Sequence, residues 1–503
     1  MLNSALRSFA FVTAAPIFLS AADATTSNRV VTVNFSAVDT RGQNVDDLRS
    51  EDLRVSDAGV RRSVLFLRRV GNDPWDPPSL GPNEVSNRGG QTAPFATVVV
   101  LDLFNEDFQI QANASQALIH DLQSIPNADS LFLYVLAIDG ALLPVHEIPV
   151  DLHFHPQKPS GGPPWTAGIK SLLDQTLSKG LGPPRASFSA TDRTVLTFQA
   201  LDTLAVQLSR IPGRKNIVWI NNGTPTALRA DSSGAGFPFS QHTGESVADY
   251  ANELKALTVQ FNSFGVALYP LSEFLTSNSF LDSYSEAALD ALVEQTGGRH
   301  NNGKGIGDVI REALRDAQTC YQLGYEEPMA AFDGKVHSIR IATDRKAVRL
   351  HTKANYFAAP EPPSADFTRM IDSAAVPAFD AAEIGLHGVI VRDRANNRLA
   401  HLHVLVNARD LALLHDNRRF TGILRLAVVG YLKSGRPADA PVSPFELTFH
   451  HSDSGHLKLL DAGIQLEQDV TVGPSITKIR LIVLDQMSHA IGTLTLPVEP
   501  QDK

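Results

Sequence analysis

A carboxylate stands directly after a nearly continuous apolar run. Asp102 follows the stretch FATVVVL directly, and Asn105 and Glu106 come a few residues later. Side-chain oxygens of these types are the ligands that a hard cation such as Mg²⁺ takes in near-octahedral geometry. A short acidic residue at a strand end also accepts backbone N–H bonds readily. Between these two roles for Asp102, we favour the second.

Two groups of histidines are further candidates for metal chemistry. His153 and His155 alternate as a strand would present them on one face, and they would need a third ligand from elsewhere to hold a transition metal. A solvated edge strand is the interpretation that we favour there. The segment FHHSDSGH forms the second group, and its Ser and Gly content favours a hairpin loop over a metal site. Its polar residues are His450, His451, Asp453 and His456.

The motifs of common enzyme classes are absent from the sequence. It contains no GxSxG elbow, no HExxH helix, no P-loop and no CxxC pair. The single cysteine, Cys320, lies in the apolar stretch TCYQLGY, where a core position is more typical than a nucleophile. We therefore predict that the protein is not an enzyme.

Composition and charge limit the class of protein. A length of 503 residues suggests about three domains, and 43% hydrophobic with 19% charged residues is typical of a folded chain. The formal net charge is −10, whereas a nucleic-acid groove needs clustered Lys and Arg to displace counterions. We expect no nucleic-acid partner.

The first 24 residues have the pattern of a signal peptide. MLNSALR is followed by an apolar run over residues 9–20 and by the small-residue pattern Ala22, Asp23, Ala24. The apolar run is too short to span a bilayer, and no later segment has an uninterrupted stretch of sufficient length. We predict export to the periplasm or the extracellular space, with no transmembrane segment in the mature chain.

Strand and helix patterns divide the rest of the chain. Residues 29–70 alternate apolar and polar side chains, which indicates a small β-rich module, and the Pro-, Gly- and Asn-rich residues 71–94 indicate a linker. From residue 95, apolar runs alternate with helical periodicity until about residue 317. This alternation predicts an α/β class with a doubly wound parallel sheet.

The helical pattern does not return after that point. Residues 319–357 contain strand patterns, which we assign to the same domain, so that the α/β domain covers residues 95–357. After a Pro-rich stretch, residues 365–503 contain short strands at regular spacing. That pattern favours an all-β sandwich, of the immunoglobulin kind.

The sequence resembles the von Willebrand factor type A-related domain family of the acidobacterial type. The match covers roughly residues 30–357 and implies a von Willebrand A-like, Rossmann-type sheet. It rests on the stretches VTVNFSAVDTRGQNVDDLRSEDLRVSDAG, VVVLDLFN, RIPGRKNIVWINNGTP and LDALVEQTGGRH, followed by YQLGYEE and DGKVHSIRI. The resemblance implies no function beyond that of a von Willebrand A fold, so it predicts the architecture better than the activity.

That resemblance implies a metal ion dependent adhesion site at the carboxyl ends of the strands. Type A domains build it from DxSxS on a first loop, Thr on a second and Asp on a third. Here Asp102 keeps the first position, but Phe104 and Glu106 stand at the two serine positions. Asn105 and Glu106 are the oxygen donors left to substitute for the serines.

The other two loops are also altered. Thr191 and Thr194 are candidates for the second loop, and Asn222 stands before Gly223 where the third loop should carry Asp. Cation affinity follows the number and charge of the ligands, so the lost hydroxyls and carboxylate lower it. We expect a degenerate site whose Mg²⁺ binding at Asp102 is weak or absent, and no other cofactor.

These observations favour an exported interaction or adhesion-type binding protein. Its partner would be a protein or a glycan recognised by the type A domain and the C-terminal sandwich. Two alternatives remain open. One is a hydrolase whose site is assembled from residues far apart in the sequence, and the other is a purely structural envelope scaffold.

Overall fold

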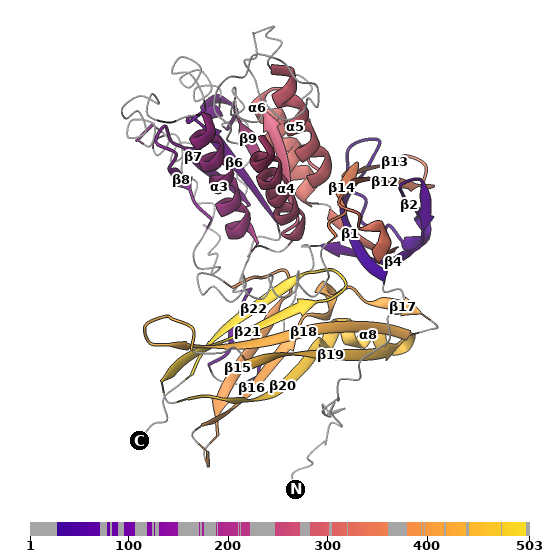
Figure 1. Ribbon diagram of the computed structural model, residues 1–503. Coiled ribbons are helices and arrows are strands. Elements are labelled where there is room, and N and C mark those ends of the chain that lie inside the picture. The colour runs from indigo at the N-terminus through magenta and orange to yellow at the C-terminus, as the bar shows by residue number, and fades with distance from the viewer. Residues whose placement is uncertain are drawn as a thin grey trace, which may run out of the picture.

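The computed structural model describes most of residues 28–498. The larger gaps within that range cover residues 71–77, 89–94, 106–117, 149–170, 176–187, 222–246, 272–281 and 361–379. The described residues form five sheets in three units, which Figure 1 shows as one helix-rich body and two β-rich bodies.

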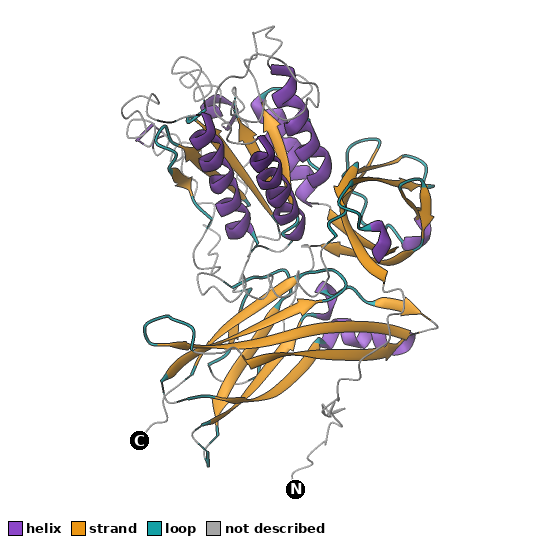
Figure 2. Ribbon diagram, viewed as in Figure 1, coloured by secondary structure: helices purple, strands orange, loops and turns teal. Residues whose placement is uncertain are grey.

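The first unit, the N-terminal sandwich, consists of two antiparallel four-stranded sheets around one apolar core (Figure 2). The strand orders are β13-β1-β11-β4 and β14-β12-β2-β3. Phe35 of one sheet and Ile339 of the other are buried in this core. The strands are β1 (Asn28–Asp39), β2 (Leu53–Asp57), β3 (Val60–Arg62), β4 (Val64–Val70), β11 (Cys320–Pro328), β12 (Val336–Thr343), β13 (Val348–Thr352) and β14 (Asn355–Phe357).

The second unit, the mixed unit, has a sheet covered by helices on both faces. The strand order is β10-β9-β6-β7-β8, in which β7 and β8 pair antiparallel and the other neighbours pair parallel. Its elements are β6 (Ala96–Asp102), β7 (Leu131–Leu136), β8 (Leu142–His146), α3 (Ala190–Leu208), β9 (Lys215–Ile220), α4 (Val247–Ser263), β10 (Val266–Leu271), α5 (Asp282–Thr296) and α6 (Ile306–Gln318).

Successive residues of β6 explain why helices cover both faces of this sheet. All seven residues of the strand are buried. Val99 points to the face where Ile310 of α6 packs, and Val100 points to the opposite face, where α3, α4 and α5 pack. An apolar run without alternation is what a strand buried on both faces requires.

The third unit, the C-terminal sandwich, packs the sheet β20-β16-β15-β5 against the sheet β17-β18-β21-β22, with β19 paired to β18. Val404 and Leu481 lie in the core between the two sheets. Its elements are β5 (Val85–Ser86), β15 (Leu386–Arg392), β16 (Leu399–Val406), β17 (Leu414–Asp416), β18 (Arg419–Leu432), β19 (Val442–Ser452), α8 (Asp453–Ala462), β20 (Ile464–Thr471), β21 (Ile476–Asp485) and β22 (Ile491–Pro497).

The mixed unit is inserted between two neighbouring strands of the N-terminal sandwich. Strands β4 and β11 pair directly, with Cys320 opposite Val70, and the mixed unit lies between them in the chain. The predicted module 29–70 therefore does not close on itself, and residues 319–357 belong to its sandwich rather than to the unit that precedes them. The predicted linker 71–94 also contributes a strand, since β5 pairs with β15.

The predicted fold class, α/β with a doubly wound parallel sheet, is wrong for this chain. Among the described residues, four of the five sheets are antiparallel throughout, and parallel pairs occur only in the sheet of the mixed unit. The error has a physical origin. Local periodicity distinguishes strands from helices, but it does not tell which distant strands pair, and here the strands on both sides of the mixed unit pair with each other.

Two expectations concern membranes and export. Residues 1–24, the expected signal peptide, lie outside the described residues. Among the described residues, no helix is long and apolar enough to cross a membrane.

The insertion predicts how fragments behave. Residues 95–357 expressed alone should aggregate or lack a cooperative thermal transition, because β11 then loses β1 on one edge and β4 on the other. Residues 28–357, which contain all eight strands, should melt cooperatively. Circular dichroism during heating distinguishes the two fragments. A cooperative transition of 95–357 with undiminished strand signal would contradict the insertion.

Candidate functional site

The carboxylate of Asp102 at the end of β6 is saturated by hydrogen bonds from the protein. Its Oδ1 accepts from the backbone N–H groups of Phe104 at 2.9 Å and Asn105 at 3.0 Å. Its Oδ2 accepts from Asn105 Nδ2 at 2.8 Å and from Trp219 Nε1 at 3.0 Å. A carboxylate offers about four lone-pair sites, so these donors occupy its accepting capacity.

Three elements hold this arrangement. Strand β6 pairs with β9 in parallel, and Trp219 of β9 lies opposite Val100, close to the end of β6. Asn105 also donates from Nδ2 to Thr197 Oγ1 at 2.9 Å, which links the turn after β6 to α3. Asp102 is thus the centre of a small network that joins a strand end, a neighbouring strand and a helix.

Burial and hydrogen bonding act on Asp102 in opposite directions. Removal from water raises the pKa of its carboxyl group, whereas the donors of Asn105, Trp219 and Phe104 favour the ionised form and lower it, and the net direction is upward. The side chain is fully buried. The network therefore serves to compensate for the burial of the carboxylate.

Of the residues considered for the predicted site besides Asp102 and Asn105, the structure describes the side chains of Phe104 and Thr194. Phe104 is fully buried in the core, and its ring meets that of Phe188 edge-on at 5.3 Å between centroids. Thr194 is buried within α3. Glu106, Asn222 and the side chain of Thr191 lie outside the described residues.

These hydrogen bonds would compete with any cation that approached Asp102. A cation at Asp102 would have to displace N–H donors from both carboxylate oxygens, and Phe104 offers no oxygen in return. The role of hydrogen-bond acceptor at the strand end, which we favoured from the sequence, is the one that Asp102 has. Trp219 and Thr197 were not found by the sequence patterns, because their link to Asp102 depends on strand order.

The second histidine group lies at a strand end and a helix start, so the predicted hairpin loop is wrong. His450 is in β19 and its Nδ1 lies 2.9 Å from Thr421 Oγ1, while His456 of α8 stacks on Phe420 with 3.7 Å between ring centroids. Ser452 caps α8 by accepting from Gly455 N. Within the described part of the chain, no three His, Cys, Asp or Glu side chains form a group suited to a metal ion.

The remaining candidates from the sequence are Cys320 and the pair His153 and His155. Cys320 is buried at the start of β11, and the core position predicted for it is confirmed. Burial raises the pKa of its thiol to about 11, which keeps it protonated at neutral pH. His153 and His155 lie outside the described residues.

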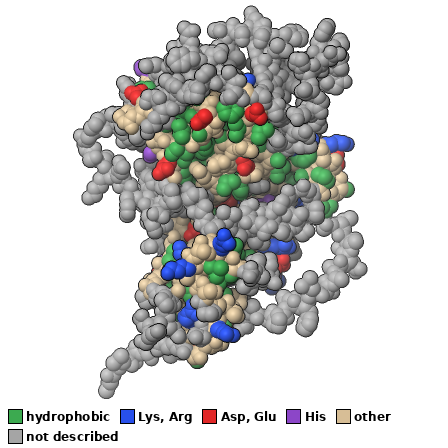
Figure 3. Space-filling model, turned by 60° about the vertical axis from the view of Figure 1, so that its left-hand side comes forward, with side chains coloured by type: hydrophobic (Ala, Val, Ile, Leu, Met, Phe, Trp, Pro, Cys, Tyr) green, Lys and Arg blue, Asp and Glu red, His purple; other side chains and the backbone are tan. Residues whose placement is uncertain are grey.

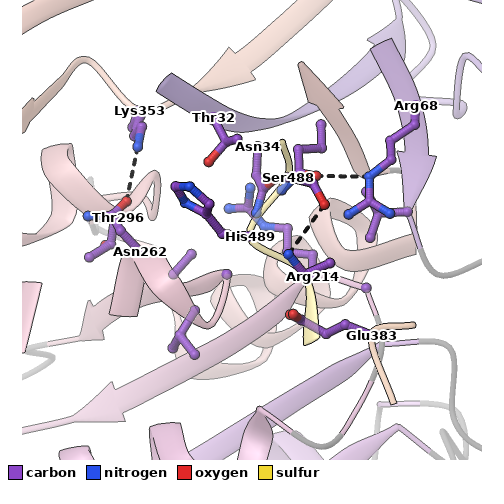
Figure 4. A pocket seen from close by; sticks show the side chains of 17 residues that line it. Thr32, Asn34, Arg68, Arg214, Asn262, Thr296, Lys353, Glu383, Ser488 and His489 are labelled. Carbon is purple, nitrogen blue, oxygen red and sulfur yellow. Dashed lines mark hydrogen bonds between the residues drawn. The ribbon is translucent and has the colours of Figure 1, made fainter. Parts of the chain in front are cut away.

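A polar joint where the three units meet was not predicted. It encloses a cavity of about 50 Å³, which we call the joint cavity (Figure 4). Lys215, fully buried at the start of β9, pairs with Glu383 of the segment that enters the C-terminal sandwich. His489, from the turn between β21 and β22, lies among residues of the other two units in Figure 4.

Asp316 of α6 joins the mixed unit to the N-terminal sandwich. Arg299 donates to both of its oxygens at 2.6 and 2.8 Å, and Tyr269 donates to Oδ2 at 2.8 Å. Ser36 of β1 donates to Oδ1 at 2.9 Å. One sequence signal could have indicated this network: Asp316 stands beside Ala317 on a helix whose neighbouring positions are apolar and buried.

The comparisons with known proteins give no argument about this geometry. No family model matches the chain, and no curated protein matches it. One solved structure that matches contains the three N-terminal domains of the type V pili tip protein Mfa5 from Porphyromonas gingivalis. The match covers 90% of this chain and 78% of that chain, with 8% sequence identity and a TM-score of 0.22. At that TM-score the likeness carries no argument, and the family resemblance stays a prediction.

Replacing Asp102 by Asn tests its role as a hydrogen-bond acceptor. Asp102→Asn keeps one accepting oxygen but points an NH₂ group at the donors of Asn105 and Trp219, so the free energy of unfolding should fall by about 1–3 kcal/mol. Asp308→Asn, which loses an exposed ion pair with Arg311, should cost under about 1 kcal/mol. Urea titration measures both. Equal stability of Asp102→Asn and wild type would show that the network is not a stabilising anchor.

Acid should weaken the joint through its histidines first. His351 of β13 contacts the mixed unit, since its Nε2 lies 3.2 and 3.1 Å from the carbonyl oxygens of Gly297 and Gly298. Burial lowers the pKa of His351 and of His489 to about 4, below the value of about 6.5 in an unfolded chain. The unfolded state therefore takes up their protons first, and stability that is fully present above about pH 6.5 is lost as the pH falls towards 4, by at most about 3 kcal/mol for each.

Asp316 acts in a lower window of pH. Burial raises the pKa of its carboxyl group, but the hydrogen bonds from Arg299 and the charges of Arg214 and Arg299 outweigh burial and hold it well below its usual range. Its contribution to stability is therefore lost only below about pH 4.

The histidines are tested by urea unfolding at several pH values. The free energy of unfolding should fall between about pH 6.5 and 4, and His351→Gln should roughly halve that fall. An unchanged fall in that variant would contradict the role given to His351 in the acid sensitivity.

Proposed function

We propose that the protein is an exported, non-enzymatic binding protein of the interaction or adhesion type, whose partner is a protein or a glycan. The observation that supports this most directly is the polar joint. Lys215 with Glu383 and Asp316 with Ser36 tie the three units together through buried contacts. Units held in one arrangement lose less conformational freedom when a partner binds, so the surface is preorganised.

The geometry gives a hydrolase less support. A hydrolase assembled from distant residues needs titratable groups that converge in a pocket large enough for a substrate. Titratable groups do meet in the joint cavity, but its volume is about 50 Å³, whereas ligand pockets typically measure about 300–1,000 Å³. A wider groove of about 560 Å³ is lined, among the described residues, by those between Lys304 and Gln318 alone, so it does not bring distant residues together. Glu383 is also already engaged by Lys215.

The surface in Figure 3 has an uneven charge distribution. Hydrophobic side chains with acidic ones among them occupy the mixed unit in that view, and Lys and Arg gather over the C-terminal sandwich. Val206 of α3 and Val259 of α4 are 44% and 36% exposed. Separated charge orients an approaching partner, which favours recognition over the purely structural scaffold.

Binding that does not depend on a metal ion is the testable consequence. The immobilised full chain should show saturable binding to a glycan on an array or to a purified envelope protein, and EDTA should leave the affinity unchanged. Millimolar Mg²⁺ should add under about 0.4 kcal/mol to the stability of the free protein.

Two results would overturn this proposal. One is turnover of ester, peptide, glycoside or phosphate substrates by the purified chain. The other is a clear rise of the melting temperature in millimolar Mg²⁺ that Asp102→Ala abolishes, because it would require metal-dependent capture of the partner.

A further inference from the structure

The joint cavity has an excess of positive charge. Three permanent or nearly permanent cations line it, namely Arg68 from β4, Arg214 before β9 and Lys353 after β13. Glu383 is the one carboxylate among the lining residues that the structure describes, and it already pairs with Lys215. The three cations come from two units, and Figure 4 places Lys353 and Arg68 on opposite sides of the cavity with His489 and Arg214 between them.

None of the three lining cations forms an ion pair with a carboxylate in the described part of the chain. Arg68 donates to Gln322 Oε1 and to the carbonyl oxygen of Asp410. Arg214 donates to Asn216, to the hydroxyl of Tyr269 and to the carbonyl of Gly297. These acceptors are all neutral.

Asp316 offsets the charge of Arg214 only in part. It lies behind Tyr269, to which it is hydrogen-bonded, and it holds Arg299 with both oxygens. Against the effect of burial, Asp316 helps to raise the pKa of Arg214, but one carboxylate does not neutralise both Arg214 and Arg299.

Lys353 is the least compensated of the three cations. Lys353 is 8% exposed, and its ammonium group has two neutral contacts: it donates one hydrogen bond to Asn262 Oδ1 at 3.1 Å and lies 6.0 Å from the centre of the Tyr356 ring. Burial alone lowers its pKa, to about 8, so the group stays mostly charged at neutral pH. Buried charges in proteins are normally paired, and an ammonium group has three donors to satisfy.

We propose that the joint cavity binds one small free oxyanion of the phosphate or sulfate kind, which supplies the counter-charge for Lys353, Arg214 and Arg68. The volume of about 50 Å³ suits a compact ion, since about 10–15 Å³ is enough for one water molecule. Thr32 adds a hydroxyl group to the lining, whereas the hydroxyl groups of Thr296 and Ser488 already donate to the Val293 carbonyl and to Asp485. The ion links the mixed unit to the N-terminal sandwich through these cations and thereby stabilises their arrangement.

Ion binding is measured directly on the full chain by equilibrium dialysis with radiolabelled sulfate and phosphate at constant ionic strength. We expect one ion per chain at low-millimolar concentration, and a melting temperature that rises and saturates over the same range. A rise without saturation is the general effect of excluded salts on any protein and would count against the site.

Matched lysine variants locate the site. Lys353→Met should bind sulfate at least roughly tenfold more weakly, as expected for a lost hydrogen bond to a charged group. Lys335→Met, which removes a lysine whose side chain is 78% exposed, should bind like wild type. If Lys353→Met does not fold, Lys353→Gln keeps a donor for Asn262 and removes the charge. Equal affinity in wild type and either Lys353 variant would overturn the proposal.

A third arm separates a free ion from the headgroup of a larger ligand. Phenyl phosphate carries the same oxyanion on a ring that the cavity has no room for, so it should not compete with labelled phosphate. Competition at equal concentration would overturn the assignment of a free ion. None of these outcomes depends on whether a protein or glycan partner is found.

Discussion

Strand β11 is the constraint on which the arrangement of the units depends. It lies between β1 and β4, so both edges of its backbone are paired within the N-terminal sandwich. The chain leaves this sheet after β4, builds the mixed unit and returns next to the strand it left. Closing a long loop costs little more free energy than closing a shorter one, because the entropic cost of closure grows only with the logarithm of the loop length. The insertion is therefore compatible with a stable sandwich.

The short connection from α6 to β11 places polar residues of the mixed unit against the N-terminal sandwich. Helix α6 ends at Gln318 and β11 begins at Cys320, so the last turn of the helix must lie against the sandwich. Asp316 then reaches Ser36 of β1, and its remaining capacity is taken by Arg299 and Tyr269. A buried polar network is favourable only when its members are satisfied, which explains why so many partners converge on one carboxylate.

The sequence predicts the features that depend on neighbouring residues better than the features that depend on contacts between distant segments. Helices such as α4 (Val247–Ser263) and α6 (Ile306–Gln318), and buried strands such as β9 (Lys215–Ile220), lie where periodicity places them, because burial patterns repeat within a few residues. Strand pairing across the insertion does not follow from periodicity, since β1 and β11 are brought together by tertiary packing alone. The fold class and the joint both depend on that pairing, so both escaped prediction.

Asp102 illustrates why the type of a residue alone does not determine its role. An acidic side chain at the end of a buried parallel strand is placed equally well to hold a cation or to accept hydrogen bonds. Trp219 on β9 and Asn105 in the turn decide between the two roles here, because each brings an N–H group to Oδ2. A serine at the position of Phe104 would offer a hydroxyl oxygen to a metal, whereas the buried phenyl ring excludes water and strengthens the N–H bonds. The chemistry of the carboxylate is thus set by neighbours that only the sheet brings together.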